Sequence, residues 1–245
     1  MTWRRGHEAH LLPDEVRGGV GDVTWHPGLP AEYRDEIVTG DARVLAEMIP
    51  DESVDLIVTD PPYPREYLHL YRWLGEVGAR VLRPGRYLFA YGAAEHLPEQ
   101  IAALHESGLT YFWTDVLLHN GGFPRVWYKR LVSGYKPVYV LTRGAPGRLA
   151  WRSTFHVCRR DKRFHTWGQG EGYPFKVIEM LTDPGNVVLD PFCGGGTVPA
   201  VCKMLGRNHV AFEIDPDVAE RARRRVRDAQ PPLLVPEPEQ LGTGL

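Results

Sequence analysis

The clearest indication of the fold is the stretch Val187-Val-Leu-Asp190-Pro191-Phe192-Cys-Gly194-Gly195-Gly196-Thr197. Its apolar start predicts a short buried strand, which ends where Pro191 removes a backbone donor. The three glycines that follow allow a tight turn and a close backbone approach to a ligand, and residues 198–205 alternate apolar faces as a helix does. A strand, a glycine turn and a helix predict a ligand site at the strand's carboxyl end. A dinucleotide site is disfavoured, because the third glycine of G-x-G-x-x-G is missing and no P-loop lysine follows.

A second apolar stretch, His209-Val-Ala-Phe212, follows this helix and ends at Glu213. An acid at the end of the next strand is placed to accept hydrogen bonds from ribose hydroxyls. The alternative is an ordinary strand, turn and helix with a surface acid.

An earlier run, Leu56-Ile-Val-Thr-Asp60-Pro61-Pro62-Tyr63, has the same form and is more specific. It offers two hydrogen-bond acceptors, the Asp60 carboxylate and the carbonyl that precedes the second proline. The exocyclic amine of a heteroaromatic base is a weak nucleophile, and two acceptors on its N–H bonds would direct its lone pair at an electrophile. Tyr63 is placed to stack on the face of a base extruded from the helix. The alternative is a Pro-Pro turn without function.

Apolar runs alternate with helical patterns over the 245 residues. This alternation predicts an α/β domain built on one doubly wound sheet. In such sheets ligands bind outside the carboxyl ends of the strands, where strand order reverses. Asp60 and Asp190 therefore predict neighbouring substrate and cofactor sites at one edge.

With Asp60-Pro-Pro-Tyr63 placed before the glycine motif, the chain resembles the β class of amino-group (N6-adenine or N4-cytosine) DNA methyltransferases, which use S-adenosylmethionine. The resemblance spans about Ile37 to Arg225. It implies the Rossmann-like class I methyltransferase fold, a mixed α/β sheet with circularly permuted motif order. Enzymes that methylate ribosomal RNA or protein glutamine usually have the opposite order, so the order favours DNA.

The resemblance also implies roles for residues. The catalytic set is Asp60, Pro61, Pro62 and Tyr63. The cofactor-binding set is Asp41, Gln169, Asp190, Pro191, Phe192, Gly194, Gly196, Thr197 and Glu213. Many members have Gln-Lys-Pro before the glycine motif, whereas this chain has Tyr173 in place of the lysine and Gln169 further upstream.

The implied reaction is direct in-line transfer of a methyl group to the amine of a base flipped out of duplex DNA, with no metal. Asp at the first position of the tetrapeptide favours the N6 of adenine. Methylation of cytosine N4 is an alternative, as are an RNA or small-molecule N-methyltransferase and a methylase-like protein that binds DNA without turnover.

The formal net charge of −2 and the pI near 6.6 hide a basic segment. Between Gly121 and His165 the only acid is Asp161, and the segment is rich in aromatic residues. Its cations are Arg125, Lys129, Arg130, Lys136, Arg143, Arg148, Arg152, Arg159, Arg160, Lys162 and Arg163. We expect a basic face for duplex DNA, with target recognition at about residues 143–163. The aromatics could equally be core positions of strands.

Three regions are expected: an N-terminal arm (1–36), the catalytic domain (37–230) and a disordered proline-rich tail (231–245). The arginine-rich stretch 217–229 is expected to be a helix with a solvated outer face. No run reaches the ~20 apolar residues of a membrane helix, no signal peptide is evident, and three cysteines suit neither disulfides nor zinc. We expect a cytoplasmic protein. Relatives often form homodimers, although no interface is evident here.

Overall fold

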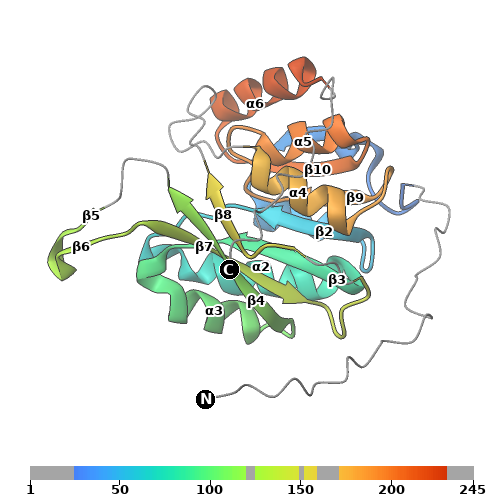
Figure 1. Cartoon of the computed structure of the whole chain (residues 1–245). Coiled ribbons are helices and arrows are strands. Elements are labelled where there is room, and N and C mark those ends of the chain that lie inside the picture. Colours follow the sequence, from blue (N-terminus) through green and yellow to red (C-terminus); the bar gives the residue numbers. More distant parts are fainter. Residues whose placement is uncertain (1–24, 120–124, 149–151, 159–170, 231–245) are drawn as a thin grey trace, which may run out of the picture.

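The computed structural model describes residues 25–119, 125–148, 152–158 and 171–230. An eight-stranded sheet in the order β1-β10-β9-β2-β3-β7-β4-β8 forms the centre of the protein (Figure 1). Its strands are β1 (Glu36–Thr39), β2 (Val54–Thr59), β3 (Leu82–Tyr91), β4 (Thr110–His119), β7 (Tyr135–Thr142), β8 (Phe155–Cys158), β9 (Val187–Asp190) and β10 (Asn208–Glu213). A two-stranded sheet pairs β5 (Arg125–Val126) with β6 (Leu131–Val132).

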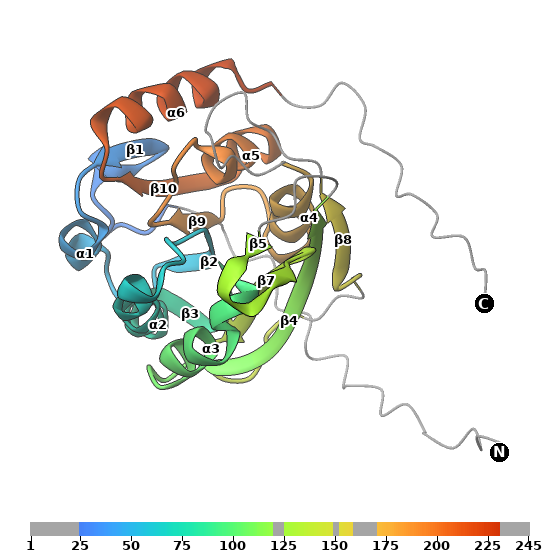
Figure 2. The same cartoon turned by 90° about the vertical axis from the view of Figure 1, so that its left-hand side faces the viewer.

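Helices cover both faces of the large sheet (Figure 2). The first group is α1 (Ala42–Leu45), α2 (Leu68–Val81) and α3 (Leu97–His105). The second group, on the other face, is α4 (Gly172–Leu181), α5 (Thr197–Leu205) and α6 (Pro216–Asp228). Short 3-10 helices lie at Ala31–Tyr33, Ala46–Met48, Arg65–Tyr67, Ala94–His96 and Trp127–Lys129.

The alternation of side chains along β2 separates two apolar cores. Ile57 packs with residues of α2 and α3, such as Leu74. Leu56 and Val58 point the other way and pack with residues of α4 and α5, such as Val177. Because both faces of β2 are buried, its sequence is a continuous apolar run rather than an alternating one.

The sheet is mixed. Strands β1, β10, β9, β2 and β3 are parallel neighbours, β7 is antiparallel to both β3 and β4, and β8 is parallel to β4. From β2 the chain continues to β3 on one side of the sheet, and from β9 it continues to β10 on the opposite side. Strand order therefore reverses between β2 and β9, and the predicted doubly wound α/β fold is confirmed.

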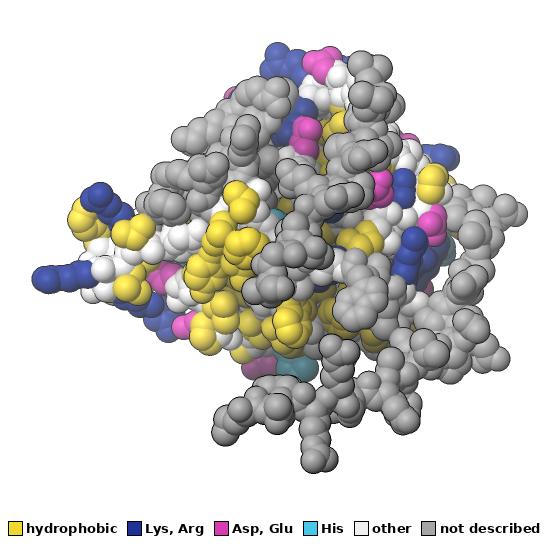
Figure 3. Space-filling model, in the orientation of Figure 1, with side chains coloured by type: hydrophobic (Ala, Val, Ile, Leu, Met, Phe, Trp, Pro, Cys, Tyr) yellow, Lys and Arg dark blue, Asp and Glu magenta, His cyan; other side chains and the backbone are white. Residues whose placement is uncertain are grey.

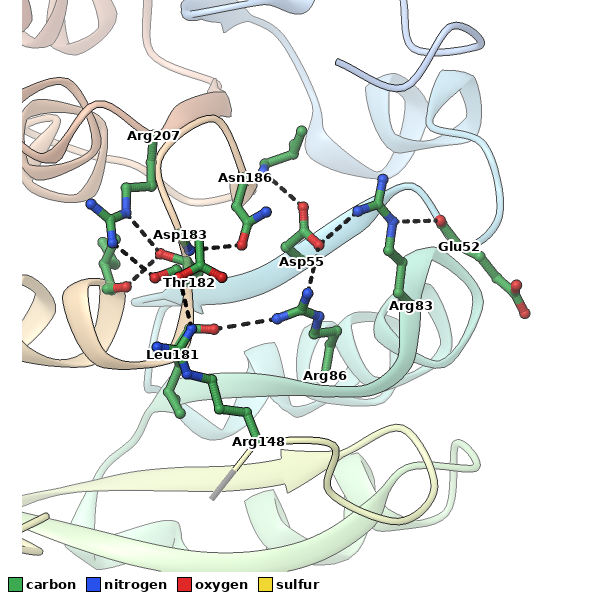
Figure 4. Close-up of polar contacts among 12 residues, drawn as sticks. Glu52, Asp55, Arg83, Arg86, Arg148, Leu181, Thr182, Asp183, Asn186 and Arg207 are labelled. Carbon is green, nitrogen blue, oxygen red and sulfur yellow. Dashed lines mark hydrogen bonds and ion pairs between the residues drawn. The ribbon is translucent and has the colours of Figure 1, made fainter. Parts of the chain in front are cut away.

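A buried carboxylate ties together the starts of these two strands (Figure 4). Asp55 in β2 accepts a hydrogen bond from the backbone N–H of Val187 in β9 at 3.0 Å. The guanidinium groups of Arg83 and Arg86 lie 2.8 and 3.3 Å from its other oxygen, so the buried charge is compensated. This anchor at the amino ends fixes how the carboxyl ends of β2 and β9 meet.

The described end of the expected N-terminal arm packs on the domain. Leu29 and Tyr33 are buried in the core cluster that includes Ala42 of α1, and Trp25 packs against the same cluster. Residues 1–24 and the expected tail, 231–245, lie outside the described part of the chain. In the ranges that are described, no helix is long and apolar enough to cross a membrane.

Candidate active site

The two Asp-Pro motifs are joined by a hydrogen bond at the carboxyl edge of the sheet. The hydroxyl of Thr59, the last residue of β2, donates to the carboxylate of Asp190, the last residue of β9, at 2.7 Å. The backbone N–H of Phe192 donates to the Thr59 hydroxyl at 3.2 Å and to the Asp190 carboxylate at 3.3 Å. The expected substrate and cofactor motifs therefore lie side by side, and Thr59, for which the sequence predicted no role, connects them.

The Asp190 carboxylate is buried and has an altered proton affinity. Burial raises the pKa of Asp190 to about 7, although the hydrogen bonds from Thr59 and Phe192 act in the opposite direction. Its hydrogen bonds with Thr59 and Phe192 hold the glycine turn in position. A role for Asp190 in cofactor binding stays a prediction.

Asp60 follows β2 directly, and among the described residues the side chains of Tyr63 and Lys136 hold it. The hydroxyl of Tyr63 donates to one of its carboxylate oxygens. The ammonium of Lys136 lies 3.2 and 3.0 Å from the two oxygens. Burial, and then the neighbouring Asp60, raise the pKa of Tyr63 well above its ordinary value, so the tyrosine is a neutral donor. Stacking of Tyr63 on a base stays a prediction.

Lys136 was expected to belong to a basic face for DNA, but its side chain is only 7% exposed. Its ammonium lies between the rings of Tyr63 and Tyr91, 4.6 and 4.7 Å from their centroids. The sequence held one indication that Lys136 points inward, because this lysine directly precedes the apolar run 137–141.

The glycine turn forms around the carboxylate of Glu213. The backbone N–H of Gly194 donates to Glu213 at 2.9 Å, and that of Asp215 donates to the other oxygen at 2.9 Å. Gly196 precedes α5 with a φ of 72°, a left-handed conformation that favours glycine. The Phe192 ring packs edge-on against Trp73 of α2. The predicted residues from Asp190 to Thr197 and Glu213 thus form one loop and its support.

Asp41 lies at the same edge. Thr39 in β1 is in register with Glu213 in β10, and the N–H of Gly40 donates to the Glu213 carbonyl at 2.9 Å. The Asp41 carboxylate caps α1 and forms an ion pair with Arg43 at 2.6 Å. The hydrogen bonds from Arg43 lower the pKa of Asp41.

Arg225 of α6 is buried, whereas Arg221, Arg224 and Arg227 are exposed on the solvated outer face expected for this helix. Its guanidinium donates to the Gly195 carbonyl at 3.1 Å and to the Thr197 hydroxyl at 2.8 Å. It also pairs with Glu171, next to the start of α4, at 2.8 Å. Arg223 likewise turns inward and donates to the Ile37 carbonyl. The hydrophobic periodicity of α6 did not predict these contacts, because it does not show which way a long polar side chain turns.

Tyr173, which replaces the family's lysine, belongs to a buried polar cluster. Its hydroxyl donates to the Asp115 carboxylate at 2.7 Å, and Arg152 pairs with the same carboxylate. The tyrosine therefore points into the core between α4 and the sheet. Gln169 lies outside the described residues. Within the described ranges, no group of three or more His, Cys, Asp and Glu side chains could hold a metal ion.

Comparisons with known proteins agree with the motifs. The family model described as DNA methylase, N6_N4_Mtase, matches residues 150–224. The type II methyltransferase M.HpaI of Haemophilus parainfluenzae is 24% identical over 231 residues, which cover 78% of this chain and 73% of that protein.

Solved structures share the fold. The crystal structure of an M1.HpyAVI–SAM complex superposes with a TM-score of 0.63 at 23% identity, covering 78% of this chain and 98% of that one. The cytosine-N4-specific PvuII DNA methyltransferase superposes with a TM-score of 0.68 at 17% identity, covering 82% and 87%. Fold and site thus define a protein of the class I methyltransferase fold. Together with its motifs, the matches support an amino-methyltransferase family, as the resemblance predicted.

Proposed function

We propose that this protein is an S-adenosylmethionine-dependent DNA methyltransferase that modifies the exocyclic N6 of adenine. The observation that carries the proposal is the Thr59–Asp190 hydrogen bond, since it sets the Asp60 tetrapeptide beside the glycine turn at the point where strand order reverses. Methyl transfer requires the donor and the amine acceptor to bind side by side, as the glycine turn and the Asp60 tetrapeptide would allow.

The residues at the edge suit the cofactor. A Cβ at Gly194 would meet no heavy atom within 4 Å, so a ligand can approach the backbone of the turn closely. Glu213 is partly exposed and retains lone pairs for the hydroxyls of a ribose. When bound, S-adenosylmethionine would supply a methyl group activated by a sulfonium. Asp41, Glu213 and the turn would hold it, with the backbone of Phe192 fixed through Thr59.

Asp60 would orient the amine. Its carboxylate already accepts N–H donors from the Lys136 ammonium, so an amino group fits hydrogen bonds to the same oxygens. Together with the Pro61 carbonyl, it would align the nitrogen and stabilise the positive charge that grows there. Tyr63 would hold the base of a nucleotide flipped from the duplex.

Cytosine N4 is a second candidate. The superposition on the cytosine-N4-specific PvuII enzyme supports it, and both amines require the same alignment. The leading Asp60 favours adenine within the family.

The test is to incubate the purified protein with labelled S-adenosylmethionine and unmethylated genomic DNA, and to identify the modified nucleoside by mass spectrometry. N6-methyladenine is expected, whereas N4-methylcytosine would overturn the base assignment alone. Asp60→Ala should bind the cofactor like the parent, measured by calorimetry, and lose transfer. Transfer by Asp60→Ala at the parent rate, or parent activity on RNA instead of DNA, would overturn the proposal.

A further inference from the structure

A short hairpin projects from the catalytic edge of the sheet. It comprises residues 125–132, in which β5 pairs with β6 around the 3-10 helix Trp127–Lys129, and is called the aromatic hairpin below. Figure 1 shows it extending beyond the rest of the sheet. In Figure 3 the projection at the left carries apolar and basic side chains together.

The hairpin exposes large apolar side chains. Trp127 and Tyr128 are 75% and 73% exposed, and Leu131 and Val132 are 59% and 60% exposed. Apolar side chains that are this exposed contribute little to the stability of the folded protein. Their presence is explained if a partner covers them. The guanidinium of Arg125 lies 5.3 Å from the Trp127 ring centroid, and the ammonium of Lys129 lies 5.4 Å from that of Tyr128.

The cations of the hairpin differ from the four later cations of the basic segment that the structure describes. Lys136, Arg143, Arg148 and Arg152 form ion pairs with Asp60, Glu52, Asp183 and Asp115. By contrast, no carboxylate of the described chain forms an ion pair with Arg125, Lys129 or Arg130. The hairpin itself contains no acid. Within the described ranges, its three cations thus lack the carboxylate partners that the later cations have.

The hairpin is rooted beside the proposed catalytic carboxylate. Lys136, which contacts Asp60, is four residues after Val132. The Tyr128 hydroxyl donates to Glu95, which lies in the 3-10 helix just after β3. A nucleic acid whose base reaches Asp60 would thus pass the hairpin.

We propose that the aromatic hairpin binds the DNA substrate next to the target base, with Trp127 stacking on a base and Arg125, Lys129 and Arg130 contacting phosphates. Two-stranded ribbons fit the major groove, and an aromatic ring inserted at a base step stabilises an opened duplex. This inference rests on the proposed function and names the contact that it would need outside the catalytic pocket.

The charge contribution can be tested against a matched control. Arg125→Gln/Lys129→Gln removes two hairpin cations, and Arg221→Gln/Arg224→Gln removes two exposed cations of α6, far from the hairpin in Figure 1. Fluorescence anisotropy with a labelled duplex, at several salt concentrations, gives affinity and salt dependence. The hairpin variant should lower the slope of log K against log salt by about 2, and the α6 variant should leave it unchanged. Equal slopes in both variants would overturn the proposal.

The aromatic contribution is tested with Trp127→Ala and Trp127→Phe. We expect Trp127→Ala to weaken duplex binding about tenfold or more and Trp127→Phe to restore most of it, with cofactor affinity unchanged in both. Unaltered DNA binding by Trp127→Ala would contradict the proposal. If that variant also changed from dimer to monomer in sedimentation, the hairpin would be assigned to a subunit contact instead. If the parent neither binds nor methylates DNA, the proposed function itself fails. If the parent does both and the hairpin variants match their controls, only this inference fails.

Discussion

The ammonium of Lys136 lies 3.0 Å from the carboxylate of Asp60, and the two side chains are 7% and 28% exposed. Taking an ammonium out of water is costly unless an anion accompanies it. The proposed catalytic carboxylate is therefore also the counter-ion of a buried cation, whose ammonium lies 4.6 and 4.7 Å from the ring centroids of Tyr63 and Tyr91.

This pairing predicts an energetic coupling between the two residues. Asp60→Asn should lower the free energy of unfolding by about 2 kcal/mol, less than for a fully buried pair because Asp60 is partly exposed. Adding Lys136→Met should recover most of the loss, since the uncompensated charge is then gone. Urea denaturation of the parent, both single variants and the double variant measures the coupling. Additive effects would show that the ion pair carries no such energy.

Asp190 predicts a specific dependence of stability on pH. The carboxyl releases its proton near pH 4 when unfolded and, because of burial, at a pKa of about 7 when folded. Between these values the folded protein binds more protons, so this residue makes the free energy of unfolding fall as pH rises from about 4 to about 7. In Asp190→Asn that contribution is absent. The difference between variant and parent should grow in favour of the variant over this range and then stay constant. A difference that is the same at pH 4, 6 and 8 would contradict the burial argument.

The strands and the glycine turn were predictable because they depend on local sequence. The runs that end at Asp60 and Asp190 are continuous and apolar, and the structure makes them β2 and β9. Their adjacency followed from the rule for parallel sheets, and the Thr59 hydrogen bond bears it out. The expected strand 209–212 is β10.

The supporting contacts were not predictable, since they depend on which way long polar side chains turn. Lys136 was counted in a basic face, and Arg225 lies in a helix expected to have a solvated outer face, but both are buried among partners distant in sequence. The composition gives the number of cations but does not show which of them form ion pairs with carboxylates in the folded protein. Only the three-dimensional structure separates the described part of the basic segment into ion-paired residues and the aromatic hairpin.

Gly196 and Gly206 provide a matched pair for the cofactor turn. Both have left-handed φ values, 72° and 69°. A Cβ on Gly206 would meet nothing within 4 Å, whereas one on Gly196 would lie 2.9 Å from the Cβ of Ala222 and 3.2 Å from its backbone. Gly206→Ala should cost about 1 kcal/mol from backbone strain. Gly196→Ala should cost more, because α6 must also shift, and should weaken cofactor binding. Equal losses of stability in denaturant, with equal cofactor affinity by calorimetry, would disprove this account.

Arg225 is expected to act on the cofactor through the turn. Its guanidinium joins the Gly195 carbonyl, the Thr197 hydroxyl and the Glu171 carboxylate, a set that a lysine ammonium cannot reach with the same fixed geometry. Arg225→Lys keeps the charge but loosens the turn, so the dissociation constant of S-adenosylmethionine should rise about tenfold, the effect of roughly 1.4 kcal/mol. The rate at saturating cofactor should change much less. The hydrogen bonds described for Asp60 and Tyr63 do not involve Arg225. Arg224→Lys, one residue away and exposed, is the control. A fall in maximal rate with unchanged cofactor affinity would instead show that Arg225 serves a step other than cofactor binding.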